Sequence, residues 1–105
     1  MANLKLTWEQ VFPKGAILGG VRPWQEYADG KRTGKQLGLA YTLVNRTGYD
    51  KVTVKIASTN PIMTNEEIEN ADDDILVIAE GFEGIVYNRD GAIAISGRAE
   101  RLVLA

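Results

Sequence analysis

Residues 36–58 read QLGLAYTLVNRTGYDKVTVKIAS, and this stretch decides the fold. In 36–45 and again in 51–58, apolar residues alternate with small or polar ones. A period of two is the mark of a strand with two different faces. The glycine in 46–49 suits a tight turn between the two runs. We therefore expect a β-hairpin here, with Lys51, Thr53 and Lys55 on the face opposite the core.

The regions on either side add further strands. Glycine and Asn/Asp turns separate apolar runs at 15–21, 75–87 and 92–104, and glycines within the last two runs predict breaks or bulges at Gly81, Gly84 and Gly97. Residues 64–70 predict one short helix, because Thr64 and Glu67 have the spacing of a capping box. The segment 22–35 contains a proline, an Asp-Gly pair and four basic residues, which fits either a long loop or an extended hairpin tip.

This order of elements predicts an all-β protein. Strand, long loop, strand, tight turn, strand, short helix, strand, tight turn and strand is the chain order of a five-stranded OB-like barrel, with its helix between the third and fourth strands. Glycine kinks suit strands that must bend to close a small barrel. An SH3-like barrel or a small sandwich shares most of these signals. We expect one domain over 1–105, with 1–14 as an extra strand or arm.

Composition narrows the choice of function. The chain has 105 residues, no Cys and no His, so disulfides, thiolate chemistry and the commonest general base are absent. We predict no enzyme activity, no cofactor and no metal site, because the acids at 66–74 lack the spacing of a calcium loop. No apolar run has the length of a membrane span, and the first ten residues lack the apolar core of a secretory signal. We expect a cytoplasmic protein.

Charge is unevenly distributed along the chain. Residues 1–63 hold nine basic and four acidic residues, whereas 64–105 hold three basic and ten acidic residues, so a net charge of −2 combines +5 with −7. Basic residues next to aromatic ones are typical of single-stranded nucleic acid binders, since cations follow the phosphates and rings stack on the bases. The alternative is that the basic and acidic halves of the sequence do not form separate surfaces in the folded protein.

The candidate binding residues come from the basic half. Phosphate contacts are expected from cations, and base stacking is expected from aromatic side chains in or beside turns. The candidates are Arg22, Trp24, Tyr27, Lys31, Arg32, Lys35, Tyr49, Lys51 and Lys55. For the charged residues the alternative is an ordinary solvated surface, and for Trp24 it is a plug packed beneath the barrel.

Three stretches resemble a known family. VRPWQEYADGKRTGKQLGLAYTLV (21–44), KVTVKIAS (51–58) and FEGIVYNRDGAIAISGRAERL (82–102) resemble small proteins of Gram-positive conjugative and related mobile elements, including helicase-processivity proteins of rolling-circle replication. The resemblance covers most of the chain and implies an OB-like single-stranded DNA binder with an accessory role in replication or transfer.

Two functions from different classes follow. The leading prediction is a non-catalytic single-stranded nucleic acid-binding protein of phage or mobile-element replication, with DNA as ligand, RNA as the alternative, and a replication protein as a further partner. The other is a protein-interaction module that works through its acidic half, as an adaptor, an inhibitor or a phage structural subunit. Sheet edges would then pair between copies to give a homo-oligomer.

Overall fold

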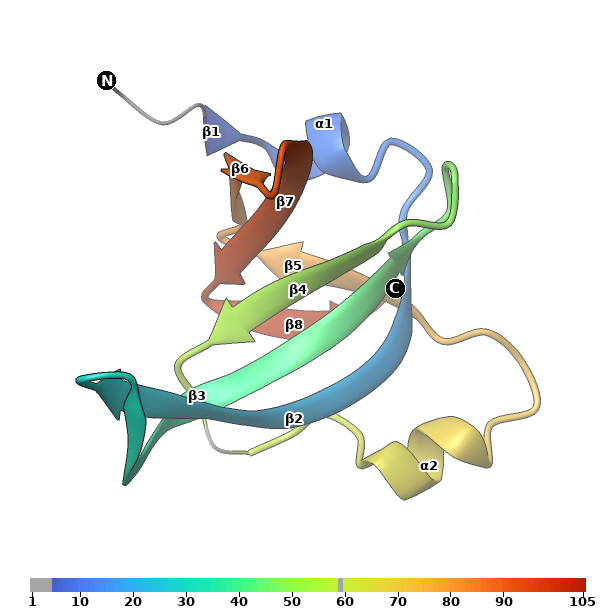
Figure 1. Cartoon of the computed structure of the whole chain (residues 1–105). Helices are drawn as coiled ribbons and strands as arrows, with labels where there is room; N and C mark the ends of the chain where they lie inside the picture. Colours follow the sequence, from blue (N-terminus) through green and yellow to red (C-terminus); the bar gives the residue numbers. More distant parts are fainter. Residues whose placement is uncertain (1–4, 59) are drawn as a thin grey trace.

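The computed structural model describes residues 5–58 and 60–105, apart from the side chains of Arg89 and Ile93. Strands account for most of this part of the chain (Figure 1). The strands are β1 (Lys5–Leu6), β2 (Ala16–Ala28), β3 (Lys31–Asn45), β4 (Lys51–Ile56), β5 (Leu76–Glu80), β6 (Glu83–Arg89), β7 (Ala92–Ala99) and β8 (Arg101–Leu104). The helices are α1 (Trp8–Val11) and α2 (Asn65–Glu69). The predicted all-β class is confirmed.

All eight strands belong to one sheet, in the order β1-β6-β7-β4-β3-β2-β5-β8. Its neighbours are antiparallel, except that β4 and β7 run parallel. Within the described residues β1 and β8 end this order, so the sheet is not closed. The predicted five-stranded barrel is therefore wrong in its strand count and in its closure.

Two of the three additional strands arise because two predicted long strands each bend and divide, and the third is β1. The run 75–87 divides into β5 and β6 at Gly81, which has a φ of +69°. The run 92–104 divides into β7 and β8 at Glu100. The two breaks face each other, since Glu80 pairs with Arg101 and Glu83 with Arg98 on either side of them. Both partners therefore bend together, and one register continues through the bend.

Gly84 and Gly97 do not break their strands, contrary to the prediction. They lie opposite each other in the β6–β7 pair, whose register is continuous. A Cβ atom on Gly97 would overlap the ring of Phe82. This glycine makes room for an aromatic side chain, so its role is in packing rather than in a bulge.

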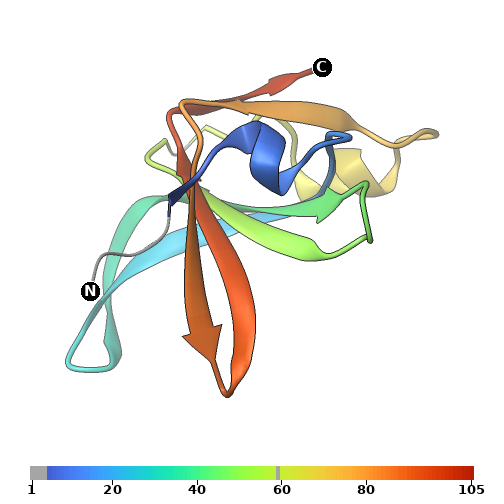
Figure 2. The same cartoon turned by 90° about the horizontal axis from the view of Figure 1, so that it is seen from above.

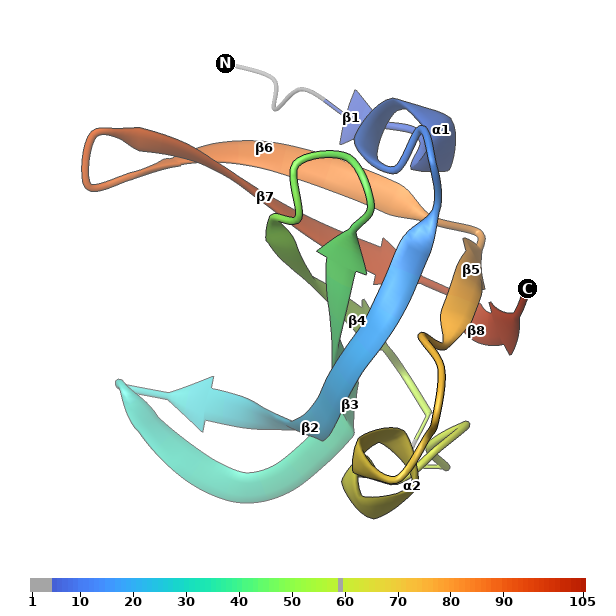
Figure 3. The same ribbon diagram turned by 90° about the vertical axis from the view of Figure 1, so that its right-hand side faces the viewer.

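Segment 22–35 forms an extended hairpin rather than a loop. β2 and β3 continue pairing out to Ala28 and Lys31, with register shifts around Trp24 and Gln25. Asp29 and Gly30 at the turn have φ values of +52° and +77°. Positive φ at both central residues is the type I′ geometry that an Asp-Gly pair favours. The hairpin end projects on the same side of the molecule as the β6–β7 hairpin (Figure 2, Figure 3).

The predicted β3–β4 hairpin is confirmed, with pairing from Leu39 opposite Ile56 to Val44 opposite Lys51. Its alternation decides which face is buried. The core-facing side chains are Leu39, Tyr41, Leu43, Val52, Val54 and Ile56, all buried. Ala40 and Lys55 point to the opposite face.

The predicted helix is present as α2, and its capping box is confirmed. The Thr64 hydroxyl accepts a hydrogen bond from the Glu67 amide, and the Glu67 carboxylate accepts one from the Thr64 amide. Its first residue also attaches the helix to the sheet. The Asn65 side chain accepts from the Val21 amide at 2.9 Å and donates to the Val21 carbonyl at 2.8 Å. This side chain therefore occupies the place of a neighbouring strand on the edge of β2.

The N-terminal segment is packed against the sheet. The predicted extra strand exists as β1, while residues 1–4 lie outside the described part. Helix α1 was not expected, because four residues are too few to show helical periodicity. It is capped by Thr7 and Gln10, and its Trp8 packs with Phe12 at 4.4 Å between ring centroids. Phe82 joins this cluster from the bend between β5 and β6.

Candidate nucleic-acid interface

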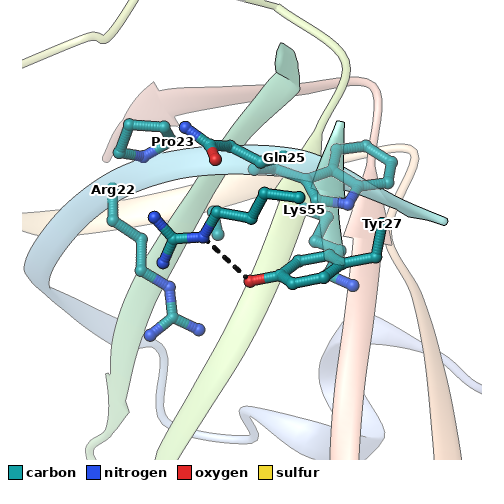
Figure 4. Close-up of a pocket in the computed structure, with 8 residues that line it drawn as sticks. Arg22, Pro23, Gln25, Tyr27 and Lys55 are labelled. Carbon is teal, nitrogen blue, oxygen red and sulfur yellow. Dashed lines mark hydrogen bonds between the residues drawn. The ribbon is translucent and has the colours of Figure 1, made fainter. Parts of the chain in front are cut away.

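A pocket of about 490 Å³ lies on the face of β2, β3 and β4 that is turned away from the core (Figure 4). Cationic and aromatic side chains make up most of its wall. The lining residues are Arg22, Pro23, Trp24, Gln25, Tyr27, Arg32, Ala40 and Lys55. In this view the Tyr27 ring extends toward the side of the pocket on which Arg22 lies. The pocket thus joins the base of the β2–β3 hairpin to the outward face of β4.

Strand register places the cations in one row. Arg22 of β2 pairs with Ala40 of β3, Ala40 pairs with Lys55 of β4, and Lys55 pairs with Arg98 of β7. Residues directly opposite on neighbouring strands point to the same face. The row therefore consists of three cations and one alanine, and Ala40, which is 3% exposed, forms part of the pocket wall.

Trp24 lies across this row. It pairs with Gly38 on β3, yet its ring centroid is 5.3 Å from Lys55 Nζ and 5.8 Å from the guanidinium carbon of Arg98. The indole must therefore extend over β3 toward β4 and β7. Cations within about 6 Å of an indole centroid are attracted by the ring quadrupole. The predicted exposed stacking residue is half-buried and already held by two cations.

A second aromatic–cation pair lies farther along the hairpin. Tyr27 is 61% exposed, and its hydroxyl accepts a hydrogen bond from Arg32 Nε at 3.3 Å. The two residues pair directly in the β2–β3 register. This bond orients the guanidinium and leaves most of the phenol ring accessible. The pair therefore offers one flat ring and one positive charge at the outer end of the pocket.

In the described part of the chain, no carboxylate forms an ion pair with the cations of the pocket. Within residues 5–58 and 60–105 the ion pairs are Lys5–Glu83 and Arg101–Glu80. Neither includes a cation of the pocket. An anion that enters here therefore meets several positive charges that no protein carboxylate neutralises at short range.

The structure places the predicted binding residues at four locations. The structure gathers five of them around the pocket, namely Arg22, Trp24, Tyr27, Arg32 and Lys55. Lys31 and Lys35 are exposed near the end of the hairpin and do not line the pocket. Tyr49 is 73% exposed in the β3–β4 turn, at φ +61°, and also lies outside it.

Lys51, the remaining candidate, lines a second cavity of about 420 Å³ between β4 and the β6–β7 hairpin. Pairing of β4 with β7 starts only at Thr53 opposite Ser96, so the two strands diverge beyond that point. Tyr87, 40% exposed, lies on the wall of this cavity. Lys51 and Tyr87 both line this cavity, and Lys51 lies on the same side of β4 as Lys55.

Arg98 was not among the predicted residues. Its signal in the sequence is weak, because it follows Gly97 in a run expected to be an ordinary strand. It joins the row only through the parallel pairing of β4 with β7, which unites segments about 40 residues apart. No local sequence pattern predicts a pairing between segments so far apart in the chain.

The acid-rich segment lies elsewhere. Asn65 attaches α2 to the edge of β2 at Val21, whereas Lys55 and Arg98 lie on the other side of β3. The acids Glu66, Glu67, Glu69, Asp72, Asp73 and Asp74 are all exposed. In the described part of the chain, no three Asp or Glu side chains are grouped in a way that would hold a metal ion. None of the helices described there is long and apolar enough to cross a membrane.

No match is found among known proteins. Comparisons with protein-family models, with curated proteins and with solved structures were all negative. The resemblance to proteins of Gram-positive mobile elements therefore stays a prediction. Any assignment of function must rest on the chemistry of the pocket itself.

Proposed function

We propose that this chain is a non-catalytic protein that binds single-stranded nucleic acid through the pocket between β2, β3 and β4. The observation that carries the proposal is the position of Trp24, whose ring lies 5.3 Å from Lys55 and 5.8 Å from Arg98. In such an arrangement the aromatic ring offers a surface on which a base stacks, and the cations next to it contact the phosphate.

The two chemical requirements of such a ligand are met by different residues. Arg22, Arg32, Lys55 and Arg98 supply positive charge for the backbone. Tyr27, with most of its ring exposed, supplies a face on which a base stacks at about 1–3 kcal/mol. A duplex keeps its bases stacked inside, so only an unpaired strand uses both sets of contacts.

Strand pairing supports an OB-like interpretation of the fold. β2, β3 and β4 form a meander, β4 runs parallel to β7, and β5 returns to pair with β2. If the short β1 is set aside and the bent pairs β5–β6 and β7–β8 are each counted as one strand, five strands with α2 between the third and fourth remain. In OB folds the second and third strands and two flanking loops bind oligonucleotides. The pocket includes side chains from the equivalent strands, β3 and β4, and from the β2–β3 hairpin.

We further propose an accessory role in the replication of a phage or mobile element, with DNA as the ligand. This step rests on the sequence resemblance alone. RNA is the alternative ligand, because stacking and phosphate contacts are common to both nucleic acids.

The direct test is fluorescence anisotropy of a labelled single-stranded oligonucleotide titrated with the protein at low and moderate salt. A duplex of the same sequence serves as the control ligand. We expect binding to the single strand, with an affinity that falls steeply as salt rises. Equal binding of the duplex would contradict the stacking contacts.

Absence of binding at low salt would reject the proposal. A protein partner would then become the better hypothesis, and the exposed acids of α2 and 72–74 would be the first surface to mutate.

A further inference from the structure

The end of the β2–β3 hairpin extends beyond the core of the domain. Residues 28–36 are all exposed, and none of them belongs to the hydrophobic core or packs against it. A two-stranded ribbon without a buried apolar face gains little stability. The hairpin nevertheless keeps its pairing out to Ala28 opposite Lys31, and its end projects from the body of the molecule (Figure 3). Packing of the core therefore does not account for its length.

The side-chain chemistry changes along this hairpin. The pocket combines rings with cations, and Tyr27 and Arg32 form its outer end. Residues 28–36 contain three cations, Lys31, Arg32 and Lys35, and no aromatic residue. Cations bind phosphates, but without rings they offer unpaired bases no surface for stacking. The hairpin end therefore fits a nucleic acid whose bases are already stacked on one another, as they are in a duplex.

The cations occupy both faces of the ribbon. Arg32 pairs with Tyr27 and shares its face, whereas the preceding residue, Lys31, points to the opposite face. The major groove of B-DNA, about 12 Å wide, admits a two-stranded β-ribbon. A ribbon that enters this groove with cations on both faces directs positive charge toward the phosphates of both DNA strands.

A bulge in β3 redirects the third cation. Residues 33–35 lie opposite Glu26 alone, where the register of β2 and β3 shifts. Gly34 has a φ of +86°, and the Thr33 hydroxyl donates to the Glu26 carboxylate at 3.2 Å. Extra residues in one strand change the direction of the side chains beside them. Lys35 therefore leaves the regular alternation of β3, and a hydrogen bond holds the Glu26 carboxylate at the bulge.

We propose that the hairpin end binds the duplex next to an unpaired strand, so that the protein recognises a junction between single-stranded and double-stranded DNA. The pocket holds the unpaired strand, and Lys31 and Lys35 contact duplex phosphates beyond its outer end. Neither lysine forms an ion pair within residues 5–58 and 60–105. This inference rests on the proposed function of the pocket and names the form of its ligand.

Anisotropy titrations with labelled DNA test the inference. The ligands are a single strand, a blunt duplex, and a duplex that carries the same single strand as a 5′ or a 3′ tail. The wild-type protein should bind at least one tailed duplex more tightly than either the single strand or the blunt duplex. Each added contact to a duplex phosphate should steepen the slope of log affinity against log salt by about 0.9.

Substitutions at the hairpin end should change binding of the tailed duplex and leave the single-strand affinity as it is. Lys31→Gln and Lys35→Gln should each reduce the salt slope on the tailed duplex by about 0.9. Asp29→Asn should tighten binding of the tailed duplex, because it removes a carboxylate and Asn-Gly keeps the type I′ turn. Lys14→Gln is the matched control, since this exposed lysine precedes the other end of β2 and should bind all ligands as wild type does.

Two results would overturn the inference while the pocket keeps its function. One is single-strand binding with no gain from either tailed duplex. The other is an equal loss of single-strand affinity in the Lys31 and Lys35 variants, which would place both lysines on the unpaired strand. Absence of single-strand binding by the wild type would instead reject the proposed function, and this inference with it.

Discussion

Gly38 and Ala40, two small residues of β3, lie beside Trp24 for different reasons. Gly38 lies opposite Trp24, and a Cβ added there would meet the backbone of Ile56 and Ala57. Ala40 is the next residue on the same face, and its small side chain lies where the ring extends toward Lys55 and Arg98. The alternation in 36–45 predicted small or polar residues on this face, and the structure adds that an aromatic side chain lies over it.

Replacing Trp24 with Ala should weaken single-strand binding by about 1–3 kcal/mol, or roughly 5- to 150-fold, because one stacking surface is lost. Anisotropy titration measures the affinity, and thermal unfolding checks that the fold is retained. Tyr49→Ala is the matched control, since this exposed ring lies outside the pocket and its removal should have little effect. Normal binding by Trp24→Ala would remove this residue from the site.

Gly38→Ala should destabilise the fold by about 1–3 kcal/mol, the usual cost of an overpacked position. An added Cβ would overlap the carbonyl oxygen of Ile56, a backbone atom that cannot move aside on its own. Urea unfolding measures the loss. At Gly20 the nearest atom to an added Cβ is Asn65 Oδ1 at an ordinary 3.5 Å, so Gly20→Ala should stay within about 0.5 kcal/mol of wild type. Equal losses for both variants would show that crowding is not the cause.

At the scale of elements, the pairing of β4 with β7 decides which cations share a site. It brings Arg98 beside Lys55, whereas the length of the β2–β3 hairpin carries Lys31 and Lys35 away from the pocket.

Alternation and capping signals in the sequence were enough to predict the β3–β4 hairpin, its two faces and the capped helix, because those signals are local. It could not find the parallel pairing, the coupled bends at Gly81 and Glu100, or α1. These depend on contacts between distant segments or on an element too short to have a period.

Salt dependence should separate the two sets of cations. If Lys55 or Arg98 contacts a phosphate, its replacement by Gln should lower the slope of log affinity against log salt by about 0.7. Lys31→Gln is the control with the same change of charge, and its slope should stay close to wild type. A larger change for Lys31 than for Lys55 would move the binding surface from the pocket to the hairpin end.

At the scale of the whole molecule, residues 5–14 belong to the fold and are not a loose arm. Phe12 is 2% exposed and stacks with Trp8, while Phe82 reaches the same cluster from the bend between β5 and β6. This cluster connects the beginning of the chain to the place where the sheet changes direction. The sequence indicated a single domain, but nothing local linked these three rings.

Phe12→Ala should destabilise the whole domain by about 3–5 kcal/mol, as expected for a buried ring. Urea unfolding followed by circular dichroism measures the loss, and Phe12→Leu should show a smaller one because it refills part of the cavity. If Phe12→Ala unfolded at the same urea concentration as wild type, the N-terminal segment would not contribute to the stability of the domain.

The residues that line the pocket all belong to β2, β3 and β4. The β2–β3 and β6–β7 hairpins project on the same side of the molecule, and their ends do not meet (Figure 2). A polymer would therefore enter from the side, at any point along its length, without threading an end. Covalently closed circles would be as accessible as linear strands. The protein would also be able to load onto a gap between two duplex regions and leave it again without sliding to a terminus.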